Sequence, residues 1–331
     1  MKIGNIQLPR YPLILAPMED VTDPPFRLLC KRFGADLMFS EFVSSDALIR
    51  DVKKTLKKME IHPAEHPYGI QLYGKVVESV VESVKIAEQY QPDLIDLNFG
   101  CPVKKVAMKG AGAGLLRDVP LMLKITAEAV KATKLPVTVK TRLGWDDQTK
   151  IIVDLSERLQ DAGIAALTIH GRTRAQMYQG EADWTLIGEV KNNPRITIPV
   201  IGNGDIDSPQ KAKQAYDRYG VDGIMIGRAA IGRPWIFSEI RQYLDTGEIP
   251  PQVMVPEQTR LIREHFAMVA QTCEEGRAVR SMRKFLAVYY KGLPDFRETR
   301  VRLLQAGTFD EVDHLLDLID ERWGEFPAYS S

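Results

Sequence analysis

Short apolar runs alternate with longer amphipathic stretches along the chain from Tyr11 to about Ile226. This alternation is typical of strand–helix units arranged around a parallel sheet. The apolar runs that we interpret as strands are residues 12–16, 37–40, 69–73, 94–98, 137–140, 166–170, 200–203 and 223–226. Eight such units predict an α/β fold with a closed (β/α)₈ TIM barrel, whereas an open doubly wound sheet more often has about five or six strands.

Helix boundary signals agree with this arrangement. Asp23-Pro24 and Ser208-Pro209 each combine a capping side chain with a proline suited to the first helical position. Gly34, Gly163 and Gly220 follow amphipathic stretches, where a glycine commonly ends a helix. We therefore expect helices between the strands, on the outside of the barrel.

The pattern changes at residues 247–251, which contain two consecutive prolines. No strand-like alternation follows, and residues 257–325 have helical periodicity throughout. We therefore expect a catalytic barrel domain at residues 1–245, and a helical domain at residues 246–331.

Composition narrows the class of protein. The 331 residues are 44% hydrophobic and 27% charged, and 44 lysines and arginines balance 44 aspartates and glutamates. These values exclude a chain that coats a polyanion over its whole surface, although a local basic patch remains compatible with neutrality. The three cysteines, Cys30, Cys101 and Cys273, are too scattered for a disulfide framework and form no CxxC metal pair. We expect a cytoplasmic protein with no metal site and no membrane segment.

Polar residues stand at the carboxyl ends of several predicted strands, which is where barrel enzymes carry their active sites. Alternation along residues 166–170 places Leu167 and Ile169 on one face and Thr168 and His170 on the other. The polar residues that the same alternation sets opposite apolar neighbours are Gln71, Asp96, Asn98, Lys140 and Asn203. One such residue alone is usually structural, but polar ends on five strands favour a functional barrel mouth.

Two glycine-containing turns follow the last two strands. Asn203-Gly204-Asp205 and Gly227-Arg228 stand where many barrels bind phosphate with backbone amides, and an arginine there can donate to phosphate oxygens. Two ordinary turns are the alternative interpretation. Cys101 lies between Gly100 and Pro102 on the loop after the fourth strand, where a thiol can face a substrate, although most lone cysteines are packing residues.

Five segments together resemble the tRNA-dihydrouridine synthase family, and most closely its bacterial B-type members. The segments are residues 16–23 (APMEDVTD), 96–102 (DLNFGCP), 167–173 (LTIHGRT), 203–206 (NGDI) and 225–228 (MIGR). The resemblance runs from the N-terminus through the barrel. In the helical tail it concerns layout more than motifs.

The resemblance implies a flavin-dependent reductase that uses bound FMN and NAD(P)H, with NADPH as the expected electron source. It acts on the 5,6 double bond of particular uridines in tRNA. Cys101 resembles the general acid that protonates C5 while hydride reaches C6, and Asn98 the residue that holds the uracil. The residues that the resemblance assigns to FMN or to its adjoining loops are Pro17, Met18, Glu19, Gln71, Lys140, His170, Asn203, Gly204, Asp205, Gly227 and Arg228. Glu19-Asp20 departs from many relatives, which have small residues there.

Charge segregation in the tail is the sequence feature that points to RNA. Residues 277–302 contain eight basic and two acidic residues, interleaved with Phe285, Tyr289, Tyr290 and Phe296, whereas residues 303–331 contain one lysine or arginine and seven acidic residues. This segregation predicts a basic, RNA-binding face, with a solvated helix as the alternative. The basic residues that we expect to contact tRNA are Lys104, Lys105, Arg172, Arg174, Arg280 and Arg283, with Lys109 on the same barrel loops.

Two other functions remain open at this point. An FMN-dependent dihydroorotate or dihydropyrimidine oxidoreductase acts on the same bond of a free base, and the basic tail argues against it because a free base needs no such platform. A non-catalytic RNA-binding barrel is the second alternative. A bound flavin would exclude it. Nothing in the sequence implies a protein partner.

Overall fold

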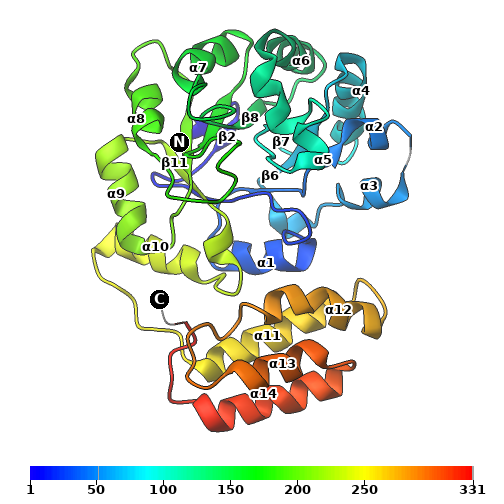
Figure 1. Cartoon of the computed structure of the whole chain (residues 1–331), viewed down its shortest axis with the longest axis vertical. Helices are drawn as coiled ribbons and strands as arrows, with labels where there is room; N and C mark the ends of the chain where they lie inside the picture. Colours follow the sequence, from blue (N-terminus) through cyan, green and yellow to red (C-terminus); the bar gives the residue numbers. More distant parts are fainter. Residues whose placement is uncertain (51, 330–331) are drawn as a thin grey trace. The chain divides into compact units, whose positions relative to one another are not determined.

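The barrel is built from eight strand positions joined side by side. The computed structural model describes residues 1–50 and 52–329, and within them all neighbouring barrel strands pair in parallel, in the order β3-β11-β10-β9-β8-β7-β6-β4 (Figure 1). The strands are β3 (Leu13–Leu15), β4 (Met38–Phe39), β6 (Tyr68–Tyr73), β7 (Leu94–Phe99), β8 (Val137–Arg142), β9 (Ala166–His170), β10 (Val200–Asn203) and β11 (Gly223–Ile226). A bridge between Ile14 and Leu37 joins the two ends of this order. The predicted TIM-barrel fold is confirmed, and β9, β10 and β11 have the predicted bounds.

Helices follow the strands on the outside of the barrel, as the capping signals predict (Figure 1). They are α1 (Pro24–Arg32), α4 (Val77–Glu88), α6 (Val119–Lys131), α7 (Ile152–Asp161), α8 (Thr185–Asn192) and α9 (Pro209–Tyr219). The Asp23 carboxylate accepts from the Phe26 amide at 3.1 Å, and Gly220 ends α9 with φ 67°. In the described part of the chain, no helix has the length and apolarity required to cross a membrane.

Several short elements were not predicted. The chain begins with an antiparallel hairpin of β1 (Lys2–Ile3) and β2 (Ile6–Gln7), and the barrel gains a short β5 (Val43–Ser44) beside β6. Short helical segments also follow two strands. They are α2 (Ser45–Leu48), α3 (Lys53–Lys57), η1 (Pro63–Glu65), α5 (Lys104–Ala107) and η2 (Gly112–Arg117). All are shorter than the window over which a hydrophobic period can be recognised.

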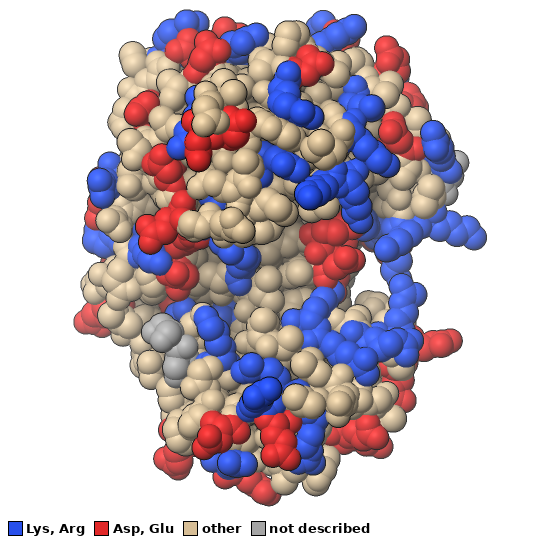
Figure 2. Space-filling view, in the orientation of Figure 1, with Lys and Arg blue, Asp and Glu red and all other residues tan. Residues whose placement is uncertain are grey.

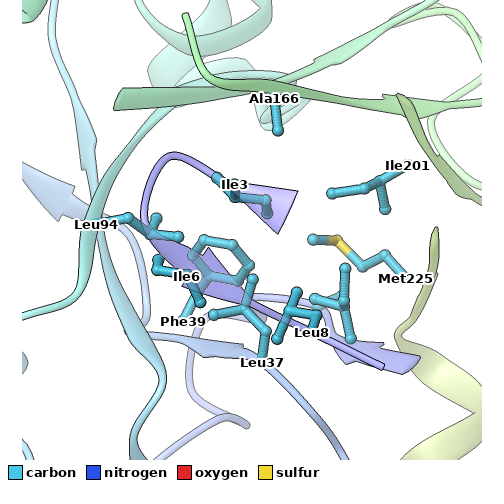
Figure 3. Packing of buried hydrophobic residues seen from close by; sticks show 11 residues of the cluster. Ile3, Ile6, Leu8, Leu37, Phe39, Leu94, Ala166, Ile201 and Met225 are labelled. Atoms are coloured by element: carbon cyan, nitrogen blue, oxygen red, sulfur yellow. The ribbon is translucent and has the colours of Figure 1, made fainter. Parts of the chain in front are cut away.

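The N-terminal hairpin fills the amino end of the barrel. Ile3, Ile6 and Leu8 are buried in one apolar cluster with side chains from six barrel strands (Figure 3). The strand residues in this cluster are Ile14, Phe39, Leu94, Ala166, Ile201 and Met225, with Leu37 just before β4. Leu94 and Ala166 are the first residues of their strands, so the cluster reaches the end of the barrel where the strands begin, and the polar side chains gather at the carboxyl end.

The second unit is entirely helical, as the sequence predicts. It contains η3 (Arg228–Ala230), α10 (Ile236–Thr246), α11 (Val255–Ala270), α12 (Glu275–Leu286), α13 (Arg297–Gln305) and α14 (Phe309–Trp323). Internal contacts divide the chain between Gly227 and Arg228, which groups α10 with the later helices. The expected domain boundary after residue 245 stays a prediction, and residues 330 and 331 of the expected helical domain lie outside the described residues.

The aromatic residues of the basic tail segment form the core of this helical unit. Phe285, Tyr289, Tyr290 and Phe296 are all buried. The ring of Phe296 lies 5.4 Å from that of Tyr290 and 5.2 Å from that of Trp323, measured between centroids. The aromatic residues interleaved with the basic ones therefore pack inside the unit, and the basic side chains of the segment remain available for the predicted RNA-binding face.

Replacing Ile3 with alanine tests the importance of the hairpin. Ile3 is fully buried against residues from several strands, so Ile3→Ala should lower the free energy of unfolding by about 2–5 kcal/mol, the range for large-to-small changes in a core. Urea denaturation measures the loss. Lys2→Ala, at an exposed position of the same hairpin, should change stability by less than about 0.5 kcal/mol. Equal effects of the two substitutions would contradict the role of Ile3 as a core residue.

Candidate active site

The predicted polar residues do converge at the carboxyl end of the barrel. Strand pairing sets Gln71 beside Asp96, Asn98 beside Lys140, and Asn203 beside His170. Gln71, Asp96, Asn98, His170 and Asn203 are each less than a tenth exposed. Since buried polar groups are costly unless they are paired, the hydrogen bonds among these side chains determine the geometry of the barrel mouth.

A chain of hydrogen bonds connects Asp96 to the loop that carries Cys101. The Asp96 carboxylate accepts from Thr138 Oγ1 at 2.6 Å and from Gln71 Nε2 at 2.7 Å. Gln71 Oε1 accepts from Asn98 Nδ2 at 2.8 Å, and Asn98 Oδ1 accepts from the amide of Cys101 at 2.8 Å. Every side chain in this series of hydrogen bonds is buried. The position of the loop that carries Cys101 therefore depends on Asp96 through the side-chain amides of Gln71 and Asn98.

The charge of Asp96 sets the direction of these amides. An ionised carboxylate only accepts hydrogen bonds, so Gln71 must present its NH₂ group to Asp96 and its oxygen to Asn98. Asn98 then has its own oxygen free to hold the Cys101 amide. Burial raises the pKa of Asp96 to about 6, against the opposing effect of the hydrogen bonds from Thr138 and Gln71. Strand alternation identified Asp96 as inward-facing, but only the structure shows its role.

The thiol of Cys101 lies at the side of this polar chain. Cys101 is 7% exposed and packs with Val106 and Ala111, beside the partly buried rings of Phe42 and Tyr73. Burial raises the pKa of the thiol, and the backbone of Val103 is the largest opposing influence. The sulfur therefore keeps its proton at neutral pH, as a general acid requires and a thiolate nucleophile does not.

Arg142, which the sequence did not single out, joins two loops of the mouth. Its side chain is buried at the end of β8, and its Nε donates to the carbonyl of Gly100 at 2.8 Å. Its Nη1 donates to the carbonyls of Thr173 and Met177, on the loop after β9. Arginine at a strand end has no periodic signal of its own, and only the three-dimensional arrangement reveals this connection.

Lys140 brings a positive charge into the mouth. Its Nζ donates to Asn203 Oδ1 at 3.1 Å, and Asn203 Nδ2 donates to the carbonyl of Met225 at 2.8 Å. Burial, followed by the neighbouring Arg142, lowers the pKa of Lys140 to about 8. An ammonium group has three donors, and the structure shows one hydrogen bond from Lys140 among the described residues. The remaining donors suit a ligand rich in hydrogen-bond acceptors.

The turn after β10 requires the glycine that the sequence places there. Gly204 has φ 128°, and a Cβ at this position would lie 2.6 Å from the Cβ of Ala182, so no larger residue fits. Asp205 follows, and its carboxylate accepts from the Ala182 amide at 2.8 Å. The side chain of His170 lies beside the same turn. The backbone of the turn after β10 is therefore held close to His170, which the sequence also assigns to the flavin.

Arg172 is buried, whereas a residue that contacts RNA would be exposed. Its side chain is 2% exposed. Its guanidinium donates to Asp205 at 2.7 Å and to the carbonyls of Gln179 and Gly180. These bonds connect the loop after β9 to the turn after β10. The assignment of Arg172 to the RNA substrate stays a prediction, although its donors already hold protein acceptors.

The loops after the first and last barrel strands meet at the mouth. A Cβ added to Gly227 would lie 3.6 Å from the sulfur of Met18, so these two predicted flavin residues are neighbours. Pro17 precedes Met18 on the loop after β3, and Arg228 begins η3 with an exposed side chain. Glu19 points to a lysine instead, forming an ion pair with Lys58.

The remaining predicted substrate residues lie outside this polar cluster. Lys104 and Lys105 are exposed on α5, three and four residues after Cys101. Arg174 is half-buried over the ring of Trp145 at 4.5 Å, and its Nε and Nη2 have no hydrogen-bond partner among the described residues. Arg280 is exposed on α12, whereas Arg283 Nη2 donates to the carbonyl of Ala306 at 3.1 Å.

The chemistry available at this mouth follows from its groups. A protonated thiol, a set of oriented amides and a buried ammonium can hold a planar, acceptor-rich ring and deliver one proton to a molecule above it. Among the described residues, no three histidines, cysteines or carboxylates are grouped to hold a metal ion.

The chain is similar to one protein family over nearly its whole length. The family model described as dihydrouridine synthase matches residues 14–321. A Rickettsia bellii protein named probable tRNA-dihydrouridine synthase is 44% identical over 301 residues, which cover 91% of this chain and 91% of that protein. The Pseudomonas aeruginosa protein named tRNA-dihydrouridine synthase B is 43% identical over 303 residues, covering 91% and 90% of the two chains.

Solved structures resemble the barrel more distantly. Morphinone reductase superposes with a TM-score of 0.50 and 13% identity, covering 76% of this chain and 90% of its own. The 6-hydroxypseudooxynicotine amine oxidase of Pseudomonas geniculata superposes with a TM-score of 0.55 and 14% identity, covering 75% and 48%. At these identities the likeness concerns the fold, and it agrees with the barrel described above.

The buried carboxyl of Asp96 should make stability depend on pH. Its pKa of about 6 exceeds the value of about 4 expected in the unfolded chain, so folding takes up a proton between these pH values. The stability that Asp96 contributes is complete below about pH 4 and is lost as the pH rises through about 6. The free energy of unfolding of the wild type relative to Asp96→Asn should therefore fall by about 3 kcal/mol from pH 4 to pH 7.

Urea denaturation at several pH values measures this dependence. Asp46→Asn, at an exposed position on α2, is the matched control, and its difference from the wild type should vary far less with pH. A difference between wild type and Asp96→Asn that stays constant from pH 4 to pH 7 would show that the carboxyl titrates normally.

Proposed function

The chain belongs to the dihydrouridine synthase family, and on that premise we propose that it reduces the C5=C6 bond of specific uridines in tRNA to 5,6-dihydrouridine. FMN is the bound cofactor in this proposal and NADPH the reductant. The observation that carries it is the buried thiol of Cys101, whose raised pKa preserves its proton beside the hydrogen-bonded polar side chains of the barrel mouth. A reduction of this kind requires one positioned proton donor from the protein.

The residues of the barrel mouth fit a flavin. Lys140 is a half-buried cation with donors left over from its bond to Asn203, and FMN is an anion with several ring acceptors. The tight turn at Gly204 allows the backbone to approach a ligand closely. Bound FMN would supply a hydride to C6 of the uracil.

We assign the other mouth residues by their place at the carboxyl end of the barrel. Pro17, Met18 and Glu19, on the loop after β3, and Gln71, Lys140 and His170, on the strands, would hold the flavin ring. The phosphate end is assigned to Asn203, Gly204, Asp205, Gly227 and Arg228. Arg172 supports this end indirectly, because its guanidinium holds Asp205 and the neighbouring carbonyls.

The protein side of the reaction concerns orientation and one proton. Asn98 holds the Cys101 amide in place, and we propose that it also faces the uracil. The Cys101 thiol donates its proton to C5 as the 5,6 bond is reduced. Closure of the opposite end of the barrel by the apolar cluster around Ile3 leaves the mouth as the route for the base.

The tRNA itself is assigned to basic residues of both units. Lys104, Lys105 and Arg174 stand on loops at the mouth, and Arg280 and Arg283 on α12. A uridine buried in folded tRNA must leave its stack to enter a barrel, which costs a few kcal/mol that phosphate contacts can offset. A cytoplasmic location suits this substrate.

The family match also weakens the free-pyrimidine alternative. It extends to residue 321 and so includes the helical unit, which a reductase of a free base does not need. The two relatives named above are similar to this chain over 301 and 303 residues, which in each case is 91% of its length. A flavin absorption band in the purified protein distinguishes the proposal from a non-catalytic RNA-binding barrel.

The enzymatic test uses tRNA that lacks dihydrouridine, with the purified flavin-loaded protein and NADPH. Wild type should form dihydrouridine in the RNA. Cys101→Ala should reduce that rate about 10²–10⁴-fold, the usual worth of a positioned proton donor, while NADPH still reduces the flavin at the normal rate. Product formation is measured by mass spectrometry of RNA digests, and flavin reduction by absorbance. A Cys101→Ala variant that modifies tRNA normally would remove Cys101 from the mechanism.

The two arginines of α12 should differ in effect. Arg280 is exposed and free to contact RNA, so Arg280→Ala should reduce the slope of log affinity for tRNA against log salt by about 0.7–0.9, with unchanged thermal stability. Arg283 holds the Ala306 carbonyl, so Arg283→Ala should also lower the free energy of unfolding by about 1–3 kcal/mol. Salt titrations of tRNA binding and thermal melts measure both. An unchanged slope for Arg280→Ala in a folded protein would contradict the proposed contact.

A further inference from the structure

A group of lysines on the barrel unit has no carboxylate partner. They follow β5, β6 and β7, on segments that leave the carboxyl ends of these strands. The seven are Lys53, Lys54 and Lys57 on α3, Lys75 before α4, and Lys104, Lys105 and Lys109 around α5. All are exposed, and the described residues form no ion pair with any of them. We call this group the basic loop surface.

On the outer helices of the same unit, by contrast, several basic residues form ion pairs with carboxylates. Each of α4, α6, α7, α8 and α9 carries a lysine or arginine whose charge is paired with a nearby carboxylate. These pairs are Lys85–Glu82, Lys131–Glu128, Arg158–Asp154, Lys191–Asp222, Lys211–Asp207 and Lys213–Asp217. These pairs balance part of the charge on the sides of the barrel, where Lys124 of α6 and Arg218 of α9 form no ion pair with the described residues, whereas none of the seven loop lysines has such a pair.

Exposed apolar side chains are found on the same segments. Within the described residues, the large hydrophobic side chains exposed on the barrel unit all follow β5, β6, β7 or β9, and none lies within the outer helices. They are Ile49, Val52, Val76, Val103, Met108, Met177 and Tyr178. Water-exposed apolar groups that are concentrated in one region rather than scattered mark a surface that binds a macromolecule.

Contacts between the loops make the basic loop surface continuous. Gly74 packs so closely against Ser45 that a Cβ on the glycine would lie 2.0 Å from the serine hydroxyl. A Cβ on Gly110 would lie 3.7 Å from the side chain of Lys75. The segment with α3, the turn with Lys75 and the loop with α5 are thus neighbours, and Figure 2 shows basic side chains gathered over the region that carries α3 and α5 in Figure 1.

Ion pairs hold the segment that carries α3 against the barrel mouth. Lys58, directly after α3, pairs with Glu19 and also with Glu41 at 3.3 Å. Further along, Glu65 forms a buried ion pair with Arg27 of α1 at 2.6 Å. Glu19, which departs from many relatives, therefore has a partner in this segment. The lysines of α3 are presented from a fixed position rather than from a free loop.

We propose that α3 and Lys75 form a second RNA-docking element on the barrel, which binds the phosphate backbone of the tRNA beside the uridine that is reduced. This inference rests on the proposed function and adds Lys53, Lys54, Lys57 and Lys75 to its substrate contacts. The unpaired ammonium groups bind phosphates, and the exposed Ile49 and Val52 contact ribose or base faces. The element continues into Lys104 and Lys105, close in sequence to the reacting thiol.

RNA fits this surface better than an acidic protein or an anionic membrane. The surface includes the loop that carries Cys101, so its occupant has to deliver a reactant into the barrel mouth. A nucleic acid combines regularly spaced phosphates with apolar base faces, which matches lysines interspersed with exposed aliphatic side chains. A membrane offers no such reactant to the mouth.

The test compares two triple variants of equal charge. Lys53→Ala, Lys54→Ala and Lys57→Ala together remove the α3 charges, and Lys85→Ala, Lys131→Ala and Lys211→Ala remove three paired lysines of the outer helices. The α3 variant should weaken tRNA binding about tenfold or more near 0.1 M salt and reduce the salt slope by about two, since each lost phosphate contact is worth about 0.7–0.9 in slope. The control variant should bind nearly as wild type does.

Further measurements separate the possible results. Flavin reduction by NADPH and the thermal midpoint should match the wild type in the α3 variant, whereas KM for tRNA should rise about tenfold or more with kcat maintained. An unchanged salt slope, or equal effects of the two triple variants, overturns the inference. The inference is also overturned if the α3 variant loses binding to vesicles with phosphatidylserine on the order of 30%, an anionic surface that attracts basic segments, while its binding to tRNA stays intact.

The inference and the proposed function fail in different ways. If the wild type forms dihydrouridine and the α3 variant binds tRNA normally, the docking element is wrong and the reaction stands. If the wild type forms no dihydrouridine while the α3 variant alone loses tRNA affinity and salt slope, the docking element stands and the reaction is wrong. Binding is measured by fluorescence anisotropy of labelled tRNA, which requires no turnover.

Discussion

The interior of the barrel permits a polar group only where a partner exists for it. At the amino end the space is filled by the N-terminal hairpin and by apolar strand residues such as Leu94 and Ala166. At the carboxyl end, strand alternation turns amides and charges inward, and each satisfies the next from Asp96 to the Cys101 loop. The depth of the reactive mouth is therefore determined by where apolar packing gives way to hydrogen bonding.

Much of this barrel could be predicted because its signals are local. Three strands have their predicted bounds, and Asp23 and Gly220 cap the helices at the predicted places. The hairpin at residues 2–7 could not be predicted, since two-residue strands have no period to recognise. The hairpin is held by packing against side chains from strands that are distant in the sequence, and no local sequence pattern indicates such contacts.

In the candidate site too, the sequence predicts which way a side chain faces but not which group it bonds to. Alternation indicates that Gln71, Asp96 and Asn98 face inward, but their donor and acceptor order depends on pairing across strands. Arg172 illustrates the converse, because a basic residue on an active-face loop suggested solvent exposure and Asp205 instead holds it inside. In the helical unit, charge counts predict a basic face on residues 277–302, whereas only helix packing shows that Phe285 and Tyr289 belong to the core.

The pairing of basic residues on α4, α6 and α9, but not on α3, also has a consequence before any contact forms. A chain with zero formal net charge feels little overall pull toward a polyanion, yet unbalanced lysines on one side give its barrel an electric dipole. Within about one Debye length, roughly 8 Å at physiological salt, the field of a polyanion exerts a torque on that dipole. The barrel thus turns its open end toward an approaching polyanion, and productive encounters become a larger share of all collisions.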